Sequence, residues 1–349
     1  MARGESLRPL GPSGLEVKTK GKWIPIGKQD ATQLGLTCDA VAVEYQITDM
    51  VKLPSMEKIS EGEATVLRDT MFIVPSPKEG VGFLFKSDLV ELFKDVNPKL
   101  HEISIPGTHD SFTYNLSKVT GLWGKTQVFD LEQQFDAGVR YFDFRLGGMN
   151  VSNLGFYHGF LCCKITLPKA LDKLRELLKK HLGETVIAML KFEYGGINED
   201  RINLLKSILD NYKDILVDPS KFGPDMRYND CKGKILLMHM ATRKDLLINN
   251  FQDASNMPSD RSDTWHLNKT SGYTLNGVVM SYARNAYHMN KYALDYISEH
   301  LGEKTGWVVM DYAGLRTEGA IEKTNVHGDE LVKILLQNNY AMVKSSILK

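Results

Sequence analysis

Cysteine is scarce in this chain, and its four cysteines lack the spacing of a metal or redox motif. Cys38, Cys162, Cys163 and Cys231 include no CxxC pair, which argues against a zinc knuckle and a thioredoxin-type site. Cys162 and Cys163 are adjacent and poorly placed to pair with each other. Four cysteines among 349 residues form no disulfide framework, and a reducing compartment suits them.

The sequence also lacks a long hydrophobic run and an excess of charge of either sign. No stretch of about 18 apolar residues predicts a membrane-spanning helix, and residues 1–14 contain no apolar signal segment. We therefore expect a cytoplasmic protein, or a secreted one if a leader has been removed. Because Lys plus Arg (43) equals Asp plus Glu (43), we expect no nucleic-acid partner, and phosphate recognition would need a few placed cations.

What the sequence does contain is the composition of a folded protein of one or two domains. Apolar residues make up 42% and charged residues 25%, enough to form a core. Residues 1–97 predict a small β-rich module, since 37–47, 64–67 and 71–75 have strand composition between Gly- and Pro-containing stretches. Without a cluster of catalytic residue types, this module is interpreted as a packing or adaptor module of unknown role. A second active site is the open alternative, and an unknown ligand of the module remains possible in either case.

From residue 98 to 349 the pattern changes to strands that alternate with amphipathic helices. Apolar strands are expected at 103–105, 139–144, 185–190, 233–238, 277–282 and 307–310, with Pro106–Gly107 and Gly147–Gly148 ending the first two. Pro168 opens a leucine-periodic helix, and others are expected near 202–209, 291–301 and 328–337. Repeated β–α units with continuous apolar strands predict an α/β fold with a parallel sheet, and six such strands favour a TIM barrel.

Polar residues follow several of these strands, where a barrel places its active site. They are His109, Asp110, Arg145, His158, Lys191, Glu193 and Asp311. Two imidazoles can serve as general base and general acid near neutral pH, and Asp110 and Asp311 are available to orient them. Arg145 and Lys191 would neutralise an anion, most naturally a phosphate.

Each of these residues has an ordinary structural explanation when taken alone. A single histidine among nine is more often a structural or surface residue. Asp110 could cap a turn, and Lys191 and Glu193 could form no more than a salt bridge at a strand end. Their joint placement at successive strand ends is what favours the functional interpretation.

Metal chemistry is the main alternative for this constellation. Zinc would need closely spaced ligands, and no HExxH motif exists. A calcium or magnesium site would use carboxylates such as Asp110 and Asp143, but Arg145 lies two residues from Asp143, on the same face of a regular strand. A guanidinium there would repel a divalent ion and could replace it, so we expect catalysis without a metal or other cofactor.

The order of the motifs resembles the bacterial-type, metal-independent phosphatidylinositol-specific phospholipases C of the X-domain superfamily. The matching segments are 103–111, 123–127, 138–145, 158–159, 184–187, 190–194, 233–235 and 306–312. The resemblance covers roughly residues 100 to 340 and implies a distorted TIM barrel. Residues 98–349 are therefore predicted to be the catalytic barrel, and residues 1–97 have no counterpart in the single-domain enzymes of this family.

The resemblance implies a concrete reaction. His109, oriented by Asp311, would take the proton from the inositol 2-hydroxyl, which attacks phosphorus. His158, paired with Asp110, would protonate the departing diacylglycerol oxygen. The products would be diacylglycerol and inositol 1,2-cyclic phosphate.

The same resemblance implies the residues that hold the substrate. Arg145 and Lys191 would contact the non-bridging phosphate oxygens, and Glu193 would lie beside them. The family carries an inositol-binding arginine after the strand at 233–237, where this chain has Met240. Arg243 is the expected substitute, so specificity for inositol is less firmly implied than phosphodiester cleavage.

A lipid substrate requires contact with a membrane surface that contains phosphatidylinositol. Trp123 falls in the short segment that family members insert into the interface, and Trp265 lies in a long polar loop with a similar expected role. Tryptophan suits the boundary between water and lipid. The alternative for Trp123 is a core anchor. With no net charge, attraction to anionic lipid would be weak and binding transient.

Two other functions remain open at this point. A metal-dependent phosphodiesterase that acts on glycerophosphodiesters or sphingolipids would use a related barrel and a carboxylate cluster. A non-catalytic lipid-binding module is disfavoured, because binding alone does not require paired histidines.

Overall fold

The structure, a computed structural model, describes residues 89–93, 96–150, 152–223, 225–239, 267–272, 274–276, 279–318 and 324–347, and six short strands before residue 87. The chain divides into two compact units. The first comprises Met1–Val96, Tyr296–Glu303 and Lys333–Lys349, and the second Asn97–Asp295 and Lys304–Val332.

The first unit contains two three-stranded antiparallel sheets. One is formed in order by β1 (Ser6–Pro9), β2 (Leu15–Thr19) and β3 (Lys22–Ile26), and the other by β4 (Glu57–Ile59), β6 (Gly82–Lys86) and β5 (Met71–Pro75). A short helix, α2 (Leu89–Phe93), follows. The strand predicted at 71–75 is β5, whereas those predicted at 37–47 and 64–67 lie outside the described residues. The boundary at residue 97 and the role of this module stay predictions.

The second unit is built on a curled sheet with a parallel centre. Its parallel strands follow the order β12 (Ile235–His239), β11 (Val186–Tyr194), β8 (Tyr141–Asn150), β7 (Ile105–Thr108), β16 (Trp307–Met310) and β13 (Leu267–Lys269). Their carboxyl ends lie at one edge, as expected for a barrel active site. β9 (Asn153–His158) and β10 (Leu161–Thr166) extend β8 as an antiparallel hairpin.

Glycine and proline do not end the first two strands of this sheet as predicted. β7 runs through Pro106 and Gly107, because the Pro106 carbonyl accepts from Arg140 and a Cβ on Gly107 would lie 2.7 Å from the ring of Tyr141. Gly107 therefore allows a close approach of β7 to its neighbour rather than a turn. Similarly, β8 continues through Gly147, where a Cβ would lie 2.7 Å from the ring of Tyr157.

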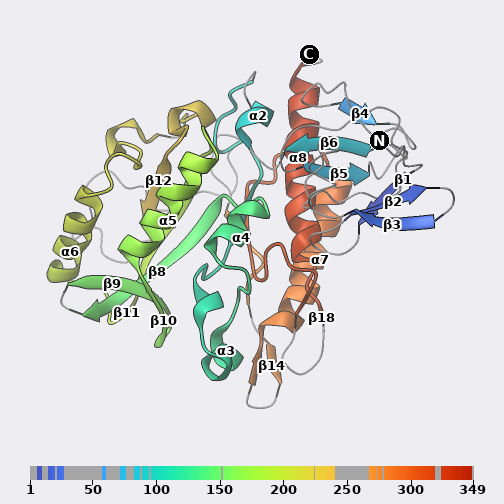
Figure 1. Ribbon diagram of the computed structural model, residues 1–349. Coiled ribbons are helices and arrows are strands. Elements are labelled where there is room, and N and C mark those ends of the chain that lie inside the picture. Colours follow the sequence, from blue (N-terminus) through green and yellow to red (C-terminus); the bar gives the residue numbers. More distant parts are fainter. Residues whose placement is uncertain are drawn as a thin grey trace. The chain divides into compact units, whose positions relative to one another are not determined.

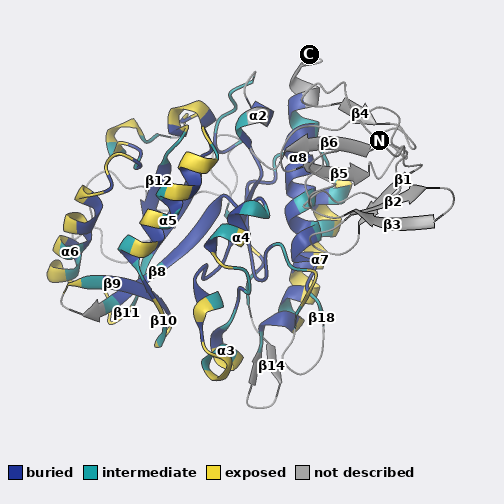
Figure 2. Ribbon diagram, in the orientation of Figure 1, coloured by how far each residue is buried: buried dark blue, intermediate teal, exposed yellow. Residues whose placement is uncertain are grey.

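The helices that cover the strands begin at sequence signals. In α5 (Leu167–Lys180), the Thr166 side chain caps the first turn by accepting from the Lys169 amide, and Pro168 occupies that turn. Its buried leucines recur every three or four residues and face the sheet, while its charged residues lie outside (Figures 1 and 2). In α6 (Glu199–Asp210), Asn198 is the cap and Ile202, Leu205, Ile208 and Leu209 are buried.

The last predicted elements are present with different limits. The helix expected near 291–301 is α7 (Tyr282–Glu299), and the one near 328–337 is α8 (Gly328–Ile347). The prediction that 277–282 forms a strand of the parallel sheet was wrong. β15 (Val279–Ser281) instead pairs antiparallel with β14 (Thr274–Asn276). Within the described part of the chain, no helix is both long and apolar enough to cross a bilayer.

Candidate active site

Parallel pairing of β7 and β16 brings His109 to Asp311. Thr108 lies opposite Met310 in the register, so the two strands end together and their next residues lie side by side. The Nδ1 atom of His109 lies 2.7 Å from Asp311 Oδ1. Since a carboxylate can only accept here, Nδ1 carries the proton and Nε2 faces away from Asp311. Asp311 is fully buried, which fixes the orientation of the imidazole.

Asp110 lies at the centre of the cluster. Its Oδ2 atom lies 3.1 Å from His109 Nε2 and 3.4 Å from His158 Nε2, and its Oδ1 atom lies 2.8 Å from Arg145 Nε. The residue adopts φ of +46°, a left-handed conformation that is uncommon outside glycine. This turn directly after β7 directs a buried carboxylate between two imidazoles and a guanidinium. Both histidines thus direct Nε2 toward the same oxygen atom.

His158 reaches the cluster from the hairpin rather than from a parallel strand. It is the last residue of β9, and its Nδ1 atom lies 2.7 Å from the carbonyl oxygen of Gly124. Gly124 ends α3 (Lys118–Gly124), and a Cβ there would lie 3.0 Å from His158 Nδ1 and 2.5 Å from Leu161. The absence of a side chain on Gly124 therefore permits the contact. When protonated, His158 donates from Nδ1 to Gly124 and from Nε2 toward Asp110.

Arg145 is held by three carboxylates. Its Nε atom lies 2.8 Å from Asp110 and 2.9 Å from Asp143, and Nη1 lies 3.0 Å from Glu193 Oε2. Lys191 stands opposite Arg145 in the β8–β11 register, with Nζ 3.3 Å from Glu193. β11 continues to Tyr194, so Lys191 and Glu193 lie on one face within the strand rather than after it. The two cations converge on the carboxyl end of the sheet.

The electrostatics of the cluster shift several pKa values. Burial favours neutral His109, but the Asp110 and Asp311 charges outweigh it and raise the pKa of His109 above its usual value. Burial raises the pKa of Asp110, opposed by the imidazoles and by Arg145. Burial also opposes ionisation of Asp143, yet the Arg145 guanidinium lowers its pKa to about 2. Arg145 is thus a fixed cation beside at least one fixed anion.

Two residues in this site were not predicted from the sequence to position other side chains. Asp143 accepts from the Asp110 amide at 3.2 Å and from Arg145, so it positions both. Its spacing of two residues from Arg145 was the available signal. Gln127 is fully buried and donates to the carbonyl oxygens of His109 (2.9 Å) and Met310 (2.8 Å), which joins the ends of β7 and β16. No residue pattern indicated this bridging role.

Three further predicted residues lie apart from the cluster or outside the described residues. Trp123 is 45% exposed on α3, so the alternative that it anchors the core was wrong. Arg243 and Trp265 lie outside the described residues, as does Met240. The expected inositol contact and the second interfacial tryptophan therefore stay predictions.

Among the residues that the structure describes, His109, Asp110 and Asp143 form the group that could hold a divalent metal ion. One ligand atom from each lies within 4.8 Å of the others. The Arg145 Nε atom, however, lies within 2.9 Å of both carboxylates. A guanidinium at this position already compensates the charge that would attract the cation, so the donor set does not suit a divalent ion while Arg145 is present.

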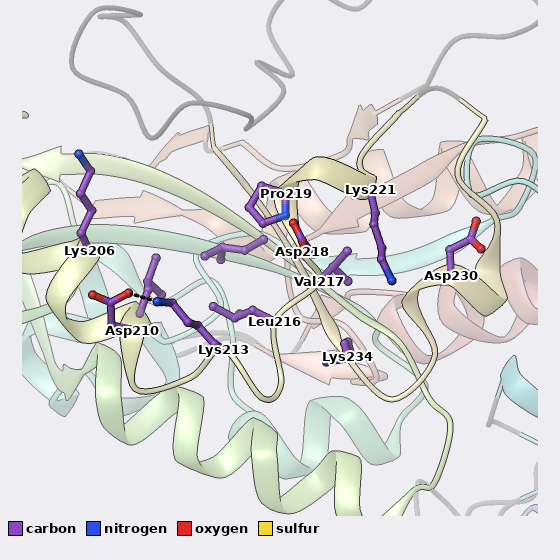
Figure 3. Close-up of a pocket in the computed structure, with 12 residues that line it drawn as sticks. Lys206, Asp210, Lys213, Leu216, Val217, Asp218, Pro219, Lys221, Asp230 and Lys234 are labelled. Atoms are coloured by element: carbon purple, nitrogen blue, oxygen red, sulfur yellow. Dashed lines mark ion pairs between the residues drawn. The ribbon is translucent and has the colours of Figure 1, made fainter.

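A cavity of about 560 Å³ lies elsewhere in the second unit, beside α6 and β12 (Figure 3). Its lining includes Lys213, Leu216, Val217, Lys221 and Lys234, and Lys213 is paired with Asp210. None of the histidines or acids of the cluster lines it. The catalytic residue types thus gather at the strand ends rather than in this cavity.

Part of the sequence and most of the fold match those of known proteins. Residues 103–240 match the family model described as "Phosphatidylinositol-specific phospholipase C, X domain". A 1-phosphatidylinositol phosphodiesterase of Listeria monocytogenes is 35% identical over 159 residues, which cover 43% of this chain and 48% of that protein. The human PI-PLC X domain-containing protein 1 is 28% identical over 167 residues, or 40% of this chain and 51% of that protein. The chain thus spans about half the length of the curated relatives that it matches.

Solved structures confirm the predicted fold class. The phosphatidylinositol-specific phospholipase C of Listeria monocytogenes has a TM-score of 0.54 and 25% identity, covering 69% of this chain and 94% of that chain. A double mutant of the corresponding Staphylococcus aureus enzyme gives 0.56 and 21%, covering 70% and 95%. The second unit is accordingly an α/β fold of the distorted TIM-barrel type, and the resemblance identified from the motifs is confirmed.

Proposed function

We propose that the protein is a phosphodiesterase that cleaves phosphatidylinositol to diacylglycerol and inositol 1,2-cyclic phosphate, since residues 103–240 match the family model of the phosphatidylinositol-specific phospholipase C X domain. The observation that carries the proposal is the convergence of both histidines and of Arg145 on the Asp110 carboxylate. This arrangement brings a base, an acid and a fixed cation together around one carboxylate. It calls for no metal ion.

His109 is the proposed general base. Asp311 holds its Nδ1–H, so Nε2, which faces Asp110, is the atom that takes the proton of the inositol 2-hydroxyl when the ring is neutral. The alkoxide oxygen then forms a bond to phosphorus. Because Asp311 stabilises the resulting imidazolium, the proton is held at a defined atom while the new P–O bond forms.

His158 is the proposed general acid. Its Nδ1 atom contacts the Gly124 carbonyl and its Nε2 atom faces Asp110 at the centre of the cluster. The Nε2 proton passes to the diacylglycerol oxygen as the second P–O bond breaks. The ring centroids of the two histidines lie 6.1 Å apart, so the proposed base and acid stand close to each other.

Arg145 and Lys191 are the proposed phosphate-binding cations. Charge that develops on the non-bridging oxygens is stabilised by donors fixed in advance, and Arg145 is fixed by Asp110, Asp143 and Glu193. Lys191 is less buried and is anchored by Glu193. Glu193 is proposed to contribute to substrate binding because it anchors Lys191. Arg243 is the proposed inositol contact.

The membrane surface is the proposed place of action, with transient association from the cytoplasm. Trp123 is exposed near the end of α3, one residue from the Gly124 carbonyl that binds His158. An exposed tryptophan beside the site suits contact with the lipid interface. Membrane binding can be modulated in the similar phosphatidylinositol-specific phospholipase C of Staphylococcus aureus, which supports the same proposal for this chain.

The proposal is tested by phosphorus NMR of phosphatidylinositol incubated with the purified protein and excess EDTA. The expected result is a cyclic phosphodiester resonance that grows at the same rate with and without the chelator, since Arg145 replaces a cation. Loss of product in EDTA with recovery on adding calcium would instead support the metal-dependent phosphodiesterase. Vesicle binding without any product would support the non-catalytic lipid-binding module.

Replacing Asp311 is expected to move the pH profile in a defined direction. A raised pKa keeps His109 protonated to higher pH, so kcat/KM of the native enzyme should fall as the pH drops through a value above 6.5. Asp311→Asn removes a charge that raises this pKa, so the acidic limb should move to lower pH while the plateau falls about 10²-fold or more. The matched control Asp218→Asn changes an exposed carboxylate that accepts from Ser220 and should leave the profile in place. A limb that stays fixed in Asp311→Asn would show that His109 is not the titrating base.

A further inference from the structure

The carbonyl group that contacts His158 lies between two others that accept from tyrosine hydroxyls. All three belong to residues 123–125 at the end of α3, where backbone carbonyls have no partner within the helix. The first accepts from Tyr282 at 3.3 Å, and the third accepts from Tyr312 at 2.9 Å. The middle one, that of Gly124, lies 2.7 Å from His158 Nδ1. The Gly124 carbonyl is therefore flanked on both sides by groups that are bound elsewhere in the second unit.

The two tyrosines reach α3 from one buried cluster. Tyr282 is the first residue of α7, and Tyr312 comes two residues after the end of β16. Each is only 6% exposed, and they share the cluster with Ala283, Ala286 and Val326. α3 lies beside the β14–β15 hairpin that Tyr282 directly follows (Figure 1). Close packing around both rings therefore fixes the positions of their hydroxyl groups.

The backbone of Tyr312 is held in a conformation that a side chain disfavours. Its φ is +56°, in the left-handed region that is uncommon for residues other than glycine and that persists where the surroundings hold it. Its amide donates to the Thr126 carbonyl at 2.7 Å, so Tyr312 binds segment 123–127 twice. Burial raises the pKa of Tyr312, which keeps its hydroxyl a donor. Since Tyr312 directly follows Asp311, the partner of the base and the support of the acid occupy adjacent positions.

The same segment also binds the backbone that carries His109. Gln127 donates from Nε2 to the carbonyl oxygens of His109 and Met310. Its Oε1 atom accepts from the Ala313 amide at 3.1 Å. Segment 123–127 thus contacts the acid through a backbone carbonyl and the backbone of the base through a buried side chain. Of the two imidazoles, only that of His158 is bound directly by this segment, since Asp311 holds the imidazole of His109.

We infer that Tyr312 and Tyr282 are positioning residues for the general acid. By holding the carbonyls on either side of Gly124, they fix the acceptor of His158 Nδ1, and this acceptor sets the direction of Nε2. The Tyr282 and His158 rings also meet in a T-shaped contact with their centroids 5.7 Å apart. The inference rests on the proposed function in taking His158 as the acid. In that step the Nε2 proton passes to the oxygen of the departing alcohol as its bond to phosphorus breaks, and the Nδ1 proton stays on the imidazole.

The test compares two water-soluble inositol phosphodiesters with the full chain, one with a simple alcohol and one with nitrophenol as the leaving group. Nitrophenolate departs without a proton, so a general acid accelerates mainly the cleavage of the alkyl diester. Tyr312→Phe keeps the ring and should lower kcat on the alkyl diester about tenfold, with the nitrophenyl diester within about twofold of native. Tyr282→Phe should give the same pattern with a smaller loss, about threefold, because its hydrogen bond is longer. His158→Ala gives the pattern for complete loss of the acid.

Tyr212→Phe is the matched control for this experiment. Tyr212 is equally buried, and its hydroxyl contacts Pro168 (3.1 Å) and Asp172 (3.0 Å) away from the histidines, so both rates should stay near the native values. Equal losses on both diesters in Tyr312→Phe would assign this tyrosine a structural role and overturn the inference, as would native rates on both. If thermal unfolding shows that Tyr312→Phe does not fold, Tyr282→Phe carries the same test. A native chain that cleaves neither diester would refute the proposed function itself, and this is seen without any variant.

Discussion

His109→Ala should lower the turnover of phosphatidylinositol by about 10²–10⁴-fold, with the fold intact. General acid–base catalysis contributes an effect of this size, and the structure gives His109 the geometry of a base, with Nδ1 held by Asp311 and Nε2 directed at the cluster centre. The loss should fall on kcat more than on KM, because the proton is transferred in the transition state. Release of diacylglycerol from mixed micelles measures both constants.

An exposed histidine provides the matched control for this variant. His288 lies on α7, where it contacts the ring of Tyr287, and His288→Ala should keep turnover within about twofold. His158→Ala should lose activity to a similar degree as His109→Ala, and the double variant should lose little more, since base and acid act as a unit. Near-native activity in either single variant would refute the assignment of that histidine.

Most of the cluster was predicted from the rule that a barrel's active site lies at the carboxyl ends of its parallel strands. This rule depends only on where those strands stop. His109, Arg145 and Asp311 follow or extend apolar runs whose β-character is plain in the sequence, and one barrel face collects them. The rule does not predict which carboxylate pairs with which imidazole. It offered one carboxylate to each imidazole, whereas the structure places Asp110 between both histidines and Arg145.

The hairpin that carries His158 was not predicted, and the reason is physical. The two glycines at 147–148 were predicted to end the strand. They are instead required because the side chains of Tyr157 and Arg201 pack against their backbone. β8 therefore runs on to Asn150 and pairs with β9. The sequence does not distinguish a glycine that is required by a neighbouring side chain from a glycine that is required by a turn. The two differ only in contacts with residues that are distant along the chain.

Positioning residues were the least predictable part of the site. Gln127 joins two strand ends through their carbonyl oxygens, a task that any sequence segment of suitable reach could supply. Asp143 orients Arg145 and the Asp110 amide, but from sequence it was a candidate metal ligand. The role of Asp143 depends on whether the guanidinium of Arg145 reaches it. In the folded chain, Arg145 Nε lies 2.9 Å from Asp143 Oδ2.

Arg145→Ala is expected to lower turnover by about 10³-fold or more, since an arginine that stabilises a phosphoryl transition state has an effect of at least this size. Arg145→Lys should recover only part of the loss, because an ammonium keeps the charge but loses the planar fork that contacts Asp110, Asp143 and Glu193. Steady-state cleavage of phosphatidylinositol measures the effect. The matched control Arg175→Ala removes a half-buried arginine that is paired with Asp214 outside the cluster and should leave turnover unchanged. Equal losses in the two alanine variants would point to destabilisation rather than to catalysis.

The same position separates metal-free from metal-dependent chemistry. Arg145→Asp adds a carboxylate where the guanidinium now neutralises Asp110 and Asp143, whose ligand atoms lie within 4.8 Å of each other and of one from His109. Oxygen ligands gathered at this distance suit Ca²⁺, so this variant should bind calcium in a calorimetric titration and regain part of its activity when the ion is added. The native chain should give no comparable heat at the site, because its cation is covalently attached. Calcium binding of equal strength in the native chain would mean that Arg145 does not exclude the ion, and it would remove the physical reason for assigning metal-free catalysis to this site.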